Sequence, residues 1–159
     1  MNKFRVLMVM IVLSAGSAAF AGNWTGFDEG FRDAAKRNVP VIVDFSAEWC
    51  GWCKKMDSDV FARPEVSSRL SKEAATVRID VDSKTPLTYR GKTTTAGQLA
   101  RLVGVQGLPT LVVFDSRGNK LAELVGYVDA KYFLRFLDYI KTKKYQSMGF
   151  EAYLRSGEK

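Results

Sequence analysis

The spacing of apolar and polar residues predicts alternating helices and strands in the first half of the chain. Apolar residues recur every three or four positions over residues 26–38, which is typical of an amphipathic helix. Two runs rich in β-branched residues, at 39–45 and 75–82, predict buried strands. Between these strands, residues 51–61 are compatible with a helix, and residues 64–72 predict a second helix with proline as its first residue.

The second half of the chain adds the elements that complete an α/β domain. A polar, threonine-rich stretch at 85–95 predicts a small hairpin that turns at Arg90 and Gly91. The remaining predicted elements are a helix at 96–103, a hairpin of strands at 109–115 and 120–127, a helix that Asp129 caps and that continues to residue 141, and a short helix at 147–154. A βαβ half followed by a ββα half predicts an α/β fold, with a central sheet and helices on both faces.

The start of the chain has a different pattern. Lys3 and Arg5 precede a short apolar run at 6–13, and Ala19 and Ala21 have the spacing of an A-x-A cleavage site. These features predict a signal peptide that is cleaved after Ala21. A membrane anchor is the alternative, but the apolar run is far shorter than the roughly 20 residues of a spanning helix. We therefore expect an exported protein.

Composition and charge limit the classes of function. The chain has 159 residues, of which 47% are hydrophobic and 26% are charged, as expected for one globular domain. A domain of this length can bury a core without a disulfide or a metal ion. The formal net charge of +7 is spread along the sequence. It therefore predicts a solvated surface rather than a nucleic-acid site.

Two cysteines carry the candidate chemistry. The sequence has only Cys50 and Cys53, and it contains no histidine, which excludes Ser–His and Cys–His catalytic sites and His-ligated metal sites. Cys50 lies where a helix begins directly after a strand, so unpaired backbone N–H groups favour its thiolate. Cys53 lies one turn further on, and the pair therefore predicts an attacking and a resolving sulfur. A purely structural disulfide and a metal ion shared between two chains remain as alternatives.

Three separate motifs resemble one known family. "VDFSAEWCGWCKK" (43–55) is similar to the active-site stretch of thioredoxins, "GVQGLPTLVVFD" (104–115) to their cis-proline segment, and "ELVGY" (123–127) to the glycine-bearing strand beside the active site. The resemblance to the thioredoxin superfamily implies a mixed central sheet. With its signal peptide, its inserted loop or hairpin at 83–96 and its tail, the chain most resembles exported SoxW-type thioredoxins. The helix after the cysteines also resembles that of the thiol-reducing domains of DsbD-like proteins.

The resemblance implies roles for individual residues. Cys50 and Cys53 would form the redox-active disulfide, with Cys50 as nucleophile and Cys53 as resolving thiol. Asp44 would be the buried acid that exchanges the Cys53 proton. A cis bond before Pro109 would let the Leu108 backbone pair with an extended substrate segment. The implied substrate-binding residues are Trp49, Gly51, Trp52, Leu108, Pro109 and Gly126.

Some of these residues allow another interpretation, and others depart from the usual sequence of the family. Half-buried packing is the alternative for Trp49, and a purely structural hydrogen bond is the alternative for Asp44. Trp52 stands where the family usually has proline, which leaves the preferred direction of exchange open. The strand lysine that often neighbours the buried acid corresponds to Thr76, so we expect a different proton route for Asp44.

Together these features predict a periplasmic thiol–disulfide oxidoreductase that reduces disulfide-containing proteins. A membrane thiol donor of the DsbD or CcdA type would recharge it, because that compartment is oxidising. A disulfide oxidase or isomerase, and a binding module whose cysteines stay in an idle disulfide, are the alternatives. We expect a monomer without cofactor, metal ion or nucleic acid. Its predicted parts are the signal peptide (1–21), a thioredoxin-like domain (22–145) and a helical extension (146–159).

Overall fold

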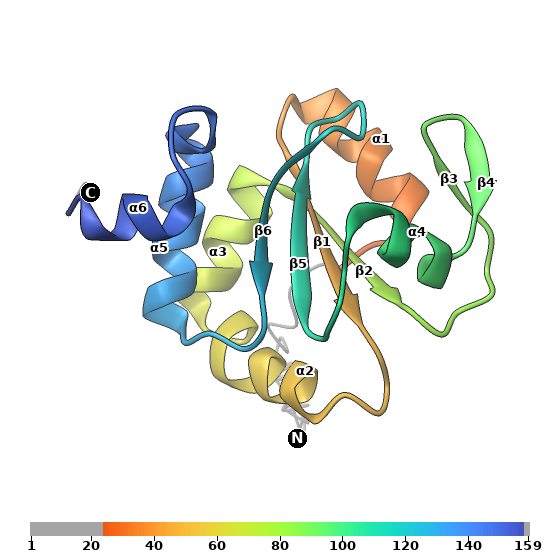
Figure 1. The fold of residues 1–159 in the computed structure, drawn as a ribbon, viewed down its shortest axis with the longest axis horizontal. Coiled ribbons are helices and arrows are strands. Elements are labelled where there is room, and N and C mark those ends of the chain that lie inside the picture. The colour runs from red at the N-terminus through yellow and green to blue at the C-terminus, as the bar shows by residue number, and fades with distance from the viewer. Residues whose placement is uncertain (1–23, 158–159) are drawn as a thin grey trace, which may run out of the picture.

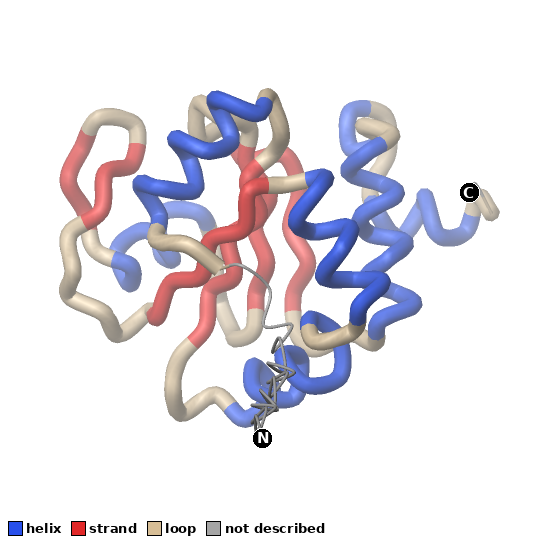
Figure 2. Tube along the Cα trace, turned by 180° about the vertical axis from the view of Figure 1, so that it is seen from behind, coloured by secondary structure: helices blue, strands red, loops and turns tan. Residues whose placement is uncertain are grey.

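The computed structural model describes residues 24–157, which form a four-stranded sheet with helices on both faces (Figure 1 and Figure 2). The strands lie in the order β2–β1–β5–β6, and their bounds are β1 (Val41–Ser46), β2 (Ala75–Asp80), β5 (Thr110–Phe114) and β6 (Lys120–Val125). β1 and β2 pair in parallel, whereas β5 is antiparallel to both β1 and β6. The predicted mixed sheet is therefore confirmed. The predicted signal peptide at 1–21 lies outside the described residues.

The helices form a layer on each face of the sheet. They are α1 (Phe27–Arg37), α2 (Gly51–Met56), α3 (Pro64–Glu73), α4 (Ala96–Val103), α5 (Ala130–Lys141) and α6 (Phe150–Arg155). Successive side chains of a strand point to opposite faces, so Val41, Val43 and Phe45 pack with α1 and α4. Ile42 packs on the other face with α3 and α5, and Asp44 shares that face. In the part of the chain that the structure describes, no helix is long and apolar enough to cross a membrane.

The helix that carries the cysteines is anchored in the core at its C-terminal end. α2 continues into a π-helical turn, η1 (Asp57–Phe61), so the helix predicted at 51–61 is confirmed. Val60 and Phe61 are buried, and the Phe61 ring meets the Phe133 ring of α5 edge to face at 5.5 Å. Burying each such side chain contributes about 1.5–3 kcal/mol. The first turn, with the cysteines, is thereby fixed at the end of β1.

The predicted hairpin is also confirmed. It consists of β3 (Leu87–Tyr89) and β4 (Lys92–Thr94), which pair antiparallel. The chain turns at Arg90 and Gly91, both with positive φ, as tight hairpin turns require. The backbone N–H of Thr88 donates to the Asp28 carboxylate of α1 at 2.9 Å. The hairpin is therefore tied to the α1 layer of the domain.

The C-terminal helix begins later than predicted. The prediction placed it at 147–154, but α6 begins at Phe150, because Gly149 is extended and the short 3₁₀ turn η2 (Lys144–Gln146) precedes it. The Phe150 ring lies 5.1 Å from a phenylalanine ring of α5, and Tyr153 is fully buried. The helix thus packs back onto α5 through these two side chains.

Candidate active site

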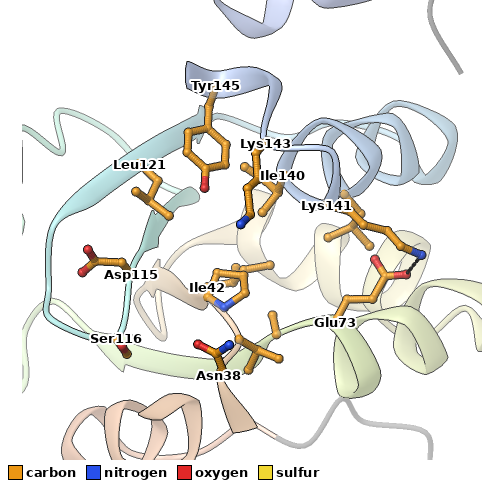
Figure 3. Close-up of a pocket in the computed structure, with 14 residues that line it drawn as sticks. Asn38, Ile42, Glu73, Asp115, Ser116, Leu121, Ile140, Lys141, Lys143 and Tyr145 are labelled. Carbon is orange, nitrogen blue, oxygen red and sulfur yellow. Dashed lines mark hydrogen bonds and ion pairs between the residues drawn. The ribbon is translucent and has the colours of Figure 1, made fainter. Parts of the chain in front are cut away.

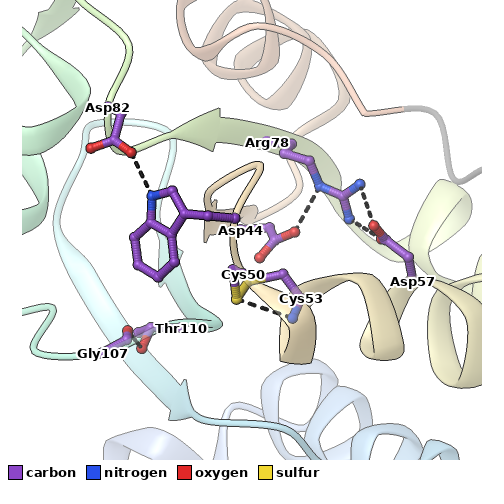
Figure 4. Close-up of a disulfide and its surroundings, with 9 residues drawn as sticks. Asp44, Cys50, Cys53, Asp57, Arg78, Asp82, Gly107 and Thr110 are labelled. Atoms are coloured by element: carbon purple, nitrogen blue, oxygen red, sulfur yellow. Dashed lines mark hydrogen bonds and ion pairs between the residues drawn. A yellow bond between two sulfur atoms is a disulfide. The ribbon is translucent and has the colours of Figure 1, made fainter.

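The two cysteines form a disulfide at the junction of β1 and α2 (Figure 4). The chain turns directly after β1, where the Cys50 N–H donates to the Ala47 carbonyl at 3.0 Å. Cys50 is then the N-cap of α2, and the backbone N–H of Cys53 donates to its Sγ at 3.1 Å. In the reduced protein this donor and the helix dipole would favour a thiolate at Cys50. The predicted position of Cys50 at a helix start is confirmed.

The outer side of the disulfide carries two projecting indoles. Cys50 and Cys53 are each only 4% exposed, whereas Trp49 is 69% and Trp52 is 58% exposed. The Trp49 indole N–H donates to the Asp82 carboxylate at 2.7 Å, and the Trp52 ring packs against the ring of a tyrosine that follows β6. Half-buried packing is therefore the wrong alternative for Trp49. The disulfide is recessed beside two large exposed aromatic surfaces.

The loop before β5 and the residue after β6 supply other parts of the predicted substrate rim. The Leu108–Pro109 peptide bond is cis, and Leu108 packs against the cysteines. The Gly126 N–H donates to the Pro109 carbonyl at 2.8 Å, and its φ of +81° is one that glycine adopts without strain. Gly51 is exposed at the first position of α2. These residues, which are distant in sequence, meet at one end of the sheet.

The inner side of the disulfide contains a buried carboxylate. Asp44, on β1, is 2% exposed, and its Oδ2 accepts a hydrogen bond of 2.7 Å from Nε of Arg78 (Figure 4). Its Oδ1 is buried and has no hydrogen-bond partner among residues 24–157. Burial raises the pKa of Asp44 to about 6, although the Arg78 charge acts in the opposite direction. The pKa of Asp44 therefore lies about one unit below neutral pH.

The residue that faces Asp44 from β2 is not the one expected. The prediction put Thr76 beside the buried acid, but the register pairs Thr76 with Ile42 and Arg78 with Asp44. The assignment of the lysine position to Thr76 is therefore wrong, and a basic side chain, Arg78, does neighbour the acid. The alternation of β2 could have indicated Arg78 as one candidate neighbour of Asp44, because the polar residues of this strand share one face. They are Thr76, Arg78 and Asp80.

Sequence reasoning also missed two neighbours of Arg78. Its NH1 donates to Asp57 Oδ2 at 3.2 Å, and its NH2 donates to Asp57 Oδ1. The Trp24 ring covers the guanidinium, with Arg78 Cζ 4.4 Å from the ring centroid. A pocket of about 320 Å³ lies beside this group, and Cys53, Asp57 and Arg78 all line it. The position of Asp57 four residues after Cys53 could have suggested that both face the same side of the helix.

A larger cavity lies at the other end of β1. It has a volume of about 410 Å³ and is lined by Asn38, which precedes β1, and by Ile42 and Ile140 (Figure 3). Glu73 and Lys141 form an ion pair of 3.3 Å at its edge. The cysteines follow the opposite end of β1, so this cavity is separate from the disulfide. Within residues 24–157, no group of three or more His, Cys, Asp or Glu side chains could hold a metal ion.

The family model of the thioredoxin-like domain matches residues 27–141. Among curated proteins, the thiol:disulfide interchange protein DsbD of Photorhabdus laumondii is 28% identical over 120 residues, which cover 74% of this chain and 19% of DsbD. DsbD of Yersinia pestis is 31% identical over 106 residues, 65% of this chain and 16% of the relative. The chain therefore spans less than a fifth of the length of these relatives.

Two solved structures have a similar fold. The solution structure of a thioredoxin from Thermus thermophilus is similar with a TM-score of 0.64 and 25% identity, over 77% of this chain and 89% of that one. The oxidised C-terminal domain of Neisseria meningitidis DsbD gives a TM-score of 0.57 and 27% identity, over 71% and 90%. Together with the cysteine pair, these likenesses support a thiol–disulfide oxidoreductase.

Proposed function

The chain belongs to the thioredoxin-like domain family, and we propose that it is a periplasmic oxidoreductase that reduces disulfides in other proteins. The observation that carries this proposal is the recessed Cys50–Cys53 disulfide at the start of α2, with the Cys53 N–H aimed at Cys50 Sγ. That donor is placed to stabilise a Cys50 thiolate, which is the form that attacks disulfides. The exposed indoles beside the pair support contact with protein substrates.

In the proposed cycle, the Cys50 thiolate attacks a substrate disulfide, and one substrate sulfur leaves as a thiolate. Cys53 then gives its proton to Asp44, and the resulting thiolate attacks Cys50 Sγ. The second substrate sulfur leaves, and the Cys50–Cys53 disulfide closes. The substrate disulfide gains the two electrons that the protein dithiol loses, and the released thiolates take protons from water. The pKa of Asp44 of about 6 supports this role, because its carboxylate is ionised at neutral pH and can accept a proton.

Substrate would bind as an extended segment across the outer side of the disulfide. We infer that the backbone of Leu108 pairs with this segment, while Trp49 and Trp52 contact its side chains. Gly51 and Gly126 carry no side chain, and a Cβ at either position would meet no atom within 4 Å, so both positions leave room for a substrate backbone.

The source of electrons follows from the compartment. The proposed signal peptide, cleaved after Ala21, would deliver the domain at 22–145 and its extension at 146–159 to the periplasm, as in SoxW-type thioredoxins. Because that compartment is oxidising, a monomeric reductase there requires a thiol donor in the membrane, of the DsbD or CcdA type. The similarity to part of DsbD supports partners that exchange thiols and disulfides.

The decisive experiment is insulin reduction by the purified mature protein with dithiothreitol. The parent protein should accelerate precipitation of the insulin B chain, and Cys50→Ser should abolish the acceleration because no attacking sulfur remains. Ser68→Ala, on the exposed surface of α3, is the matched control and should retain full activity. If Cys50→Ser reduced insulin as fast as the parent, the enzymatic function would be contradicted and the alternative of a binding module would be favoured.

The direction of exchange needs a measurement in cells, because Trp52 replaces the usual proline. Thiol alkylation of intact cells should find the cysteine pair mostly reduced, and loss of the membrane donor should make it oxidised. A pair that is oxidised in both strains would instead identify a disulfide oxidase or isomerase.

A further inference from the structure

The guanidinium of Arg78 joins two carboxylates that come from different elements (Figure 4). Its Nε binds Asp44 on β1, and its two terminal nitrogens bind both oxygens of Asp57 on η1. Such a two-point contact fixes the plane of a guanidinium as well as its position. Arg78 itself is on β2, so this bridge connects β1 and the neighbouring edge strand β2 to the helix that carries the cysteines.

Two aromatic rings also lie against the guanidinium, and the Arg78 side chain is 28% exposed. Trp24 lies over it at 4.4 Å, and the Phe61 ring centroid is 5.8 Å away. The chain next to Trp24 is itself anchored, because the Arg78 N–H donates to the Thr25 carbonyl at 3.2 Å. Arg78 is therefore held by Asp57 at one end and shielded by aromatic rings on its faces.

The bridge makes the two oxygens of Asp44 unequal. Oδ2 accepts the 2.7 Å hydrogen bond from Arg78, whereas Oδ1 is buried without a hydrogen-bond partner among the described residues. An arginine guanidinium keeps its protons in proteins, so Arg78 cannot pass a proton to or from Oδ2. Oδ1, which accepts no hydrogen bond from residues 24–157, is therefore the oxygen best placed to carry a proton that Asp44 exchanges.

We propose that Asp57 is a positioning residue for the thiol chemistry, which holds Arg78 against Oδ2 of Asp44 so that Oδ1 receives the proton of Cys53. This inference rests on the proposed function. In the resolving step, the Cys53 S–H bond breaks, its proton forms a bond to Oδ1, and the sulfur lone pair attacks Cys50 Sγ. The bond between Cys50 and the substrate sulfur breaks, and that sulfur leaves with the electron pair.

A purely electrostatic role for Asp57 predicts the opposite result on Asp44. The negative charge of Asp57 by itself raises the pKa of Asp44, so its removal alone would lower that pKa. If Asp57 positions Arg78, its loss instead frees the guanidinium, weakens the contact with Oδ2 and raises the pKa. The other charged groups of the pocket are Glu48 before α2, Lys54 on α2 and Asp80 on β2. Substitution of Asp57 leaves these three side chains unchanged, so they do not distinguish the two roles.

The test is a pH titration of the Asp44 carboxyl carbon by ¹³C NMR, in the oxidised protein. Asp57→Ala should move the Asp44 midpoint upward by about one pH unit, because an opposite charge contributes one unit or more. Asp57→Asn, which keeps the side-chain shape but only one oxygen, should move it upward by less. Asp57→Glu, with two oxygens, should restore the parent midpoint. A downward shift or an unchanged midpoint in Asp57→Ala overturns the proposal.

Three further variants make the result specific. Arg78→Gln should raise the Asp44 midpoint, and adding Asp57→Ala to it should cause no further rise, since no guanidinium is left to position. Glu65→Ala removes the same charge from an exposed site on α3 and should leave the midpoint unchanged. A further rise in the double variant would show that Asp57 does not act through Arg78.

The resolving step gives the functional readout. Release of substrate from a mixed disulfide at Cys50 should depend on pH with the same midpoint as Asp44, and this dependence should shift upward in Asp57→Ala. If release keeps the parent pH profile while the NMR midpoint moves, Asp44 does not take the proton and the proposal fails. Failure of the proposed function is recognised separately, by insulin reduction that is equal in the parent and Cys50→Ser.

Discussion

The two sides of the Cys50–Cys53 disulfide are built from different kinds of side chain. On the outer side, Trp49 and Trp52 are mostly exposed and Leu108 packs against the cysteines. On the inner side, Asp44 is buried and bound to Arg78, which is covered by aromatic rings. The outer side offers apolar contact area to another protein, and the inner side controls a proton. Recognition and proton transfer can therefore be changed separately.

The largest expected effect concerns the inner side. Asp44 has a pKa of about 6 in the folded protein, above its ordinary value of 3.8, so the folded state binds this proton more tightly than the unfolded state. The stability that this proton gives is fully present below pH 3.8 and is lost as the pH rises through 6. The loss is about 3 kcal/mol at neutral pH.

Asp44→Asn removes this pH dependence. Between pH 4 and pH 7 the parent should lose about 2 kcal/mol of stability through Asp44, so over this range the oxidised variant should become more stable relative to the parent by about that amount. Urea unfolding at both pH values measures the difference, and the parent serves as the reference for all other carboxylates. A constant difference between the two proteins would show that Asp44 is not held in a protonated form at low pH.

A smaller effect is expected on the outer side. Trp49→Ala or Trp52→Ala should raise KM for a protein substrate about five- to tenfold, because truncation of a contacting tryptophan typically costs more than 1 kcal/mol of binding. The pH profile of the resolving step should be unchanged, since neither indole contacts Asp44 or Arg78 in the structure. Tyr145→Ala, which removes a ring from the cavity at the other end of the sheet, is the control. An altered pH profile in the tryptophan variants would mean that the two sides do not work independently.

Local patterns predicted most of the fold and the centre of the site. The strand at β1 and the helix after it follow from a β-branched run and from helical spacing, which are properties of neighbouring residues. The position of Cys50 at the start of α2 follows from the same short stretch. The late start of α6 was missed because Gly149 and the 3₁₀ turn before it interrupt a spacing that still reads as helical.

The inner side of the site could not be predicted in the same way. Arg78 is 34 residues from Asp44 in sequence, and Thr76 and Arg78 share one face of β2, so alternation alone could not decide which of them meets the acid. The parallel register of β1 and β2 made that choice. Trp24 is further still from Arg78 in sequence and meets it only because Thr25 pairs with β2.

The sequence by itself determined where helices and strands form and which two sulfur atoms can react, because both depend on residues that are near one another along the chain. Only the tertiary structure decided which charged side chain faces Asp44 and which Asp44 oxygen accepts the hydrogen bond from Arg78. It also decided that Asp57 binds the same arginine. Those outcomes depend on the register of paired strands and on the docking of a helix over them, which arise from the packing of the whole core.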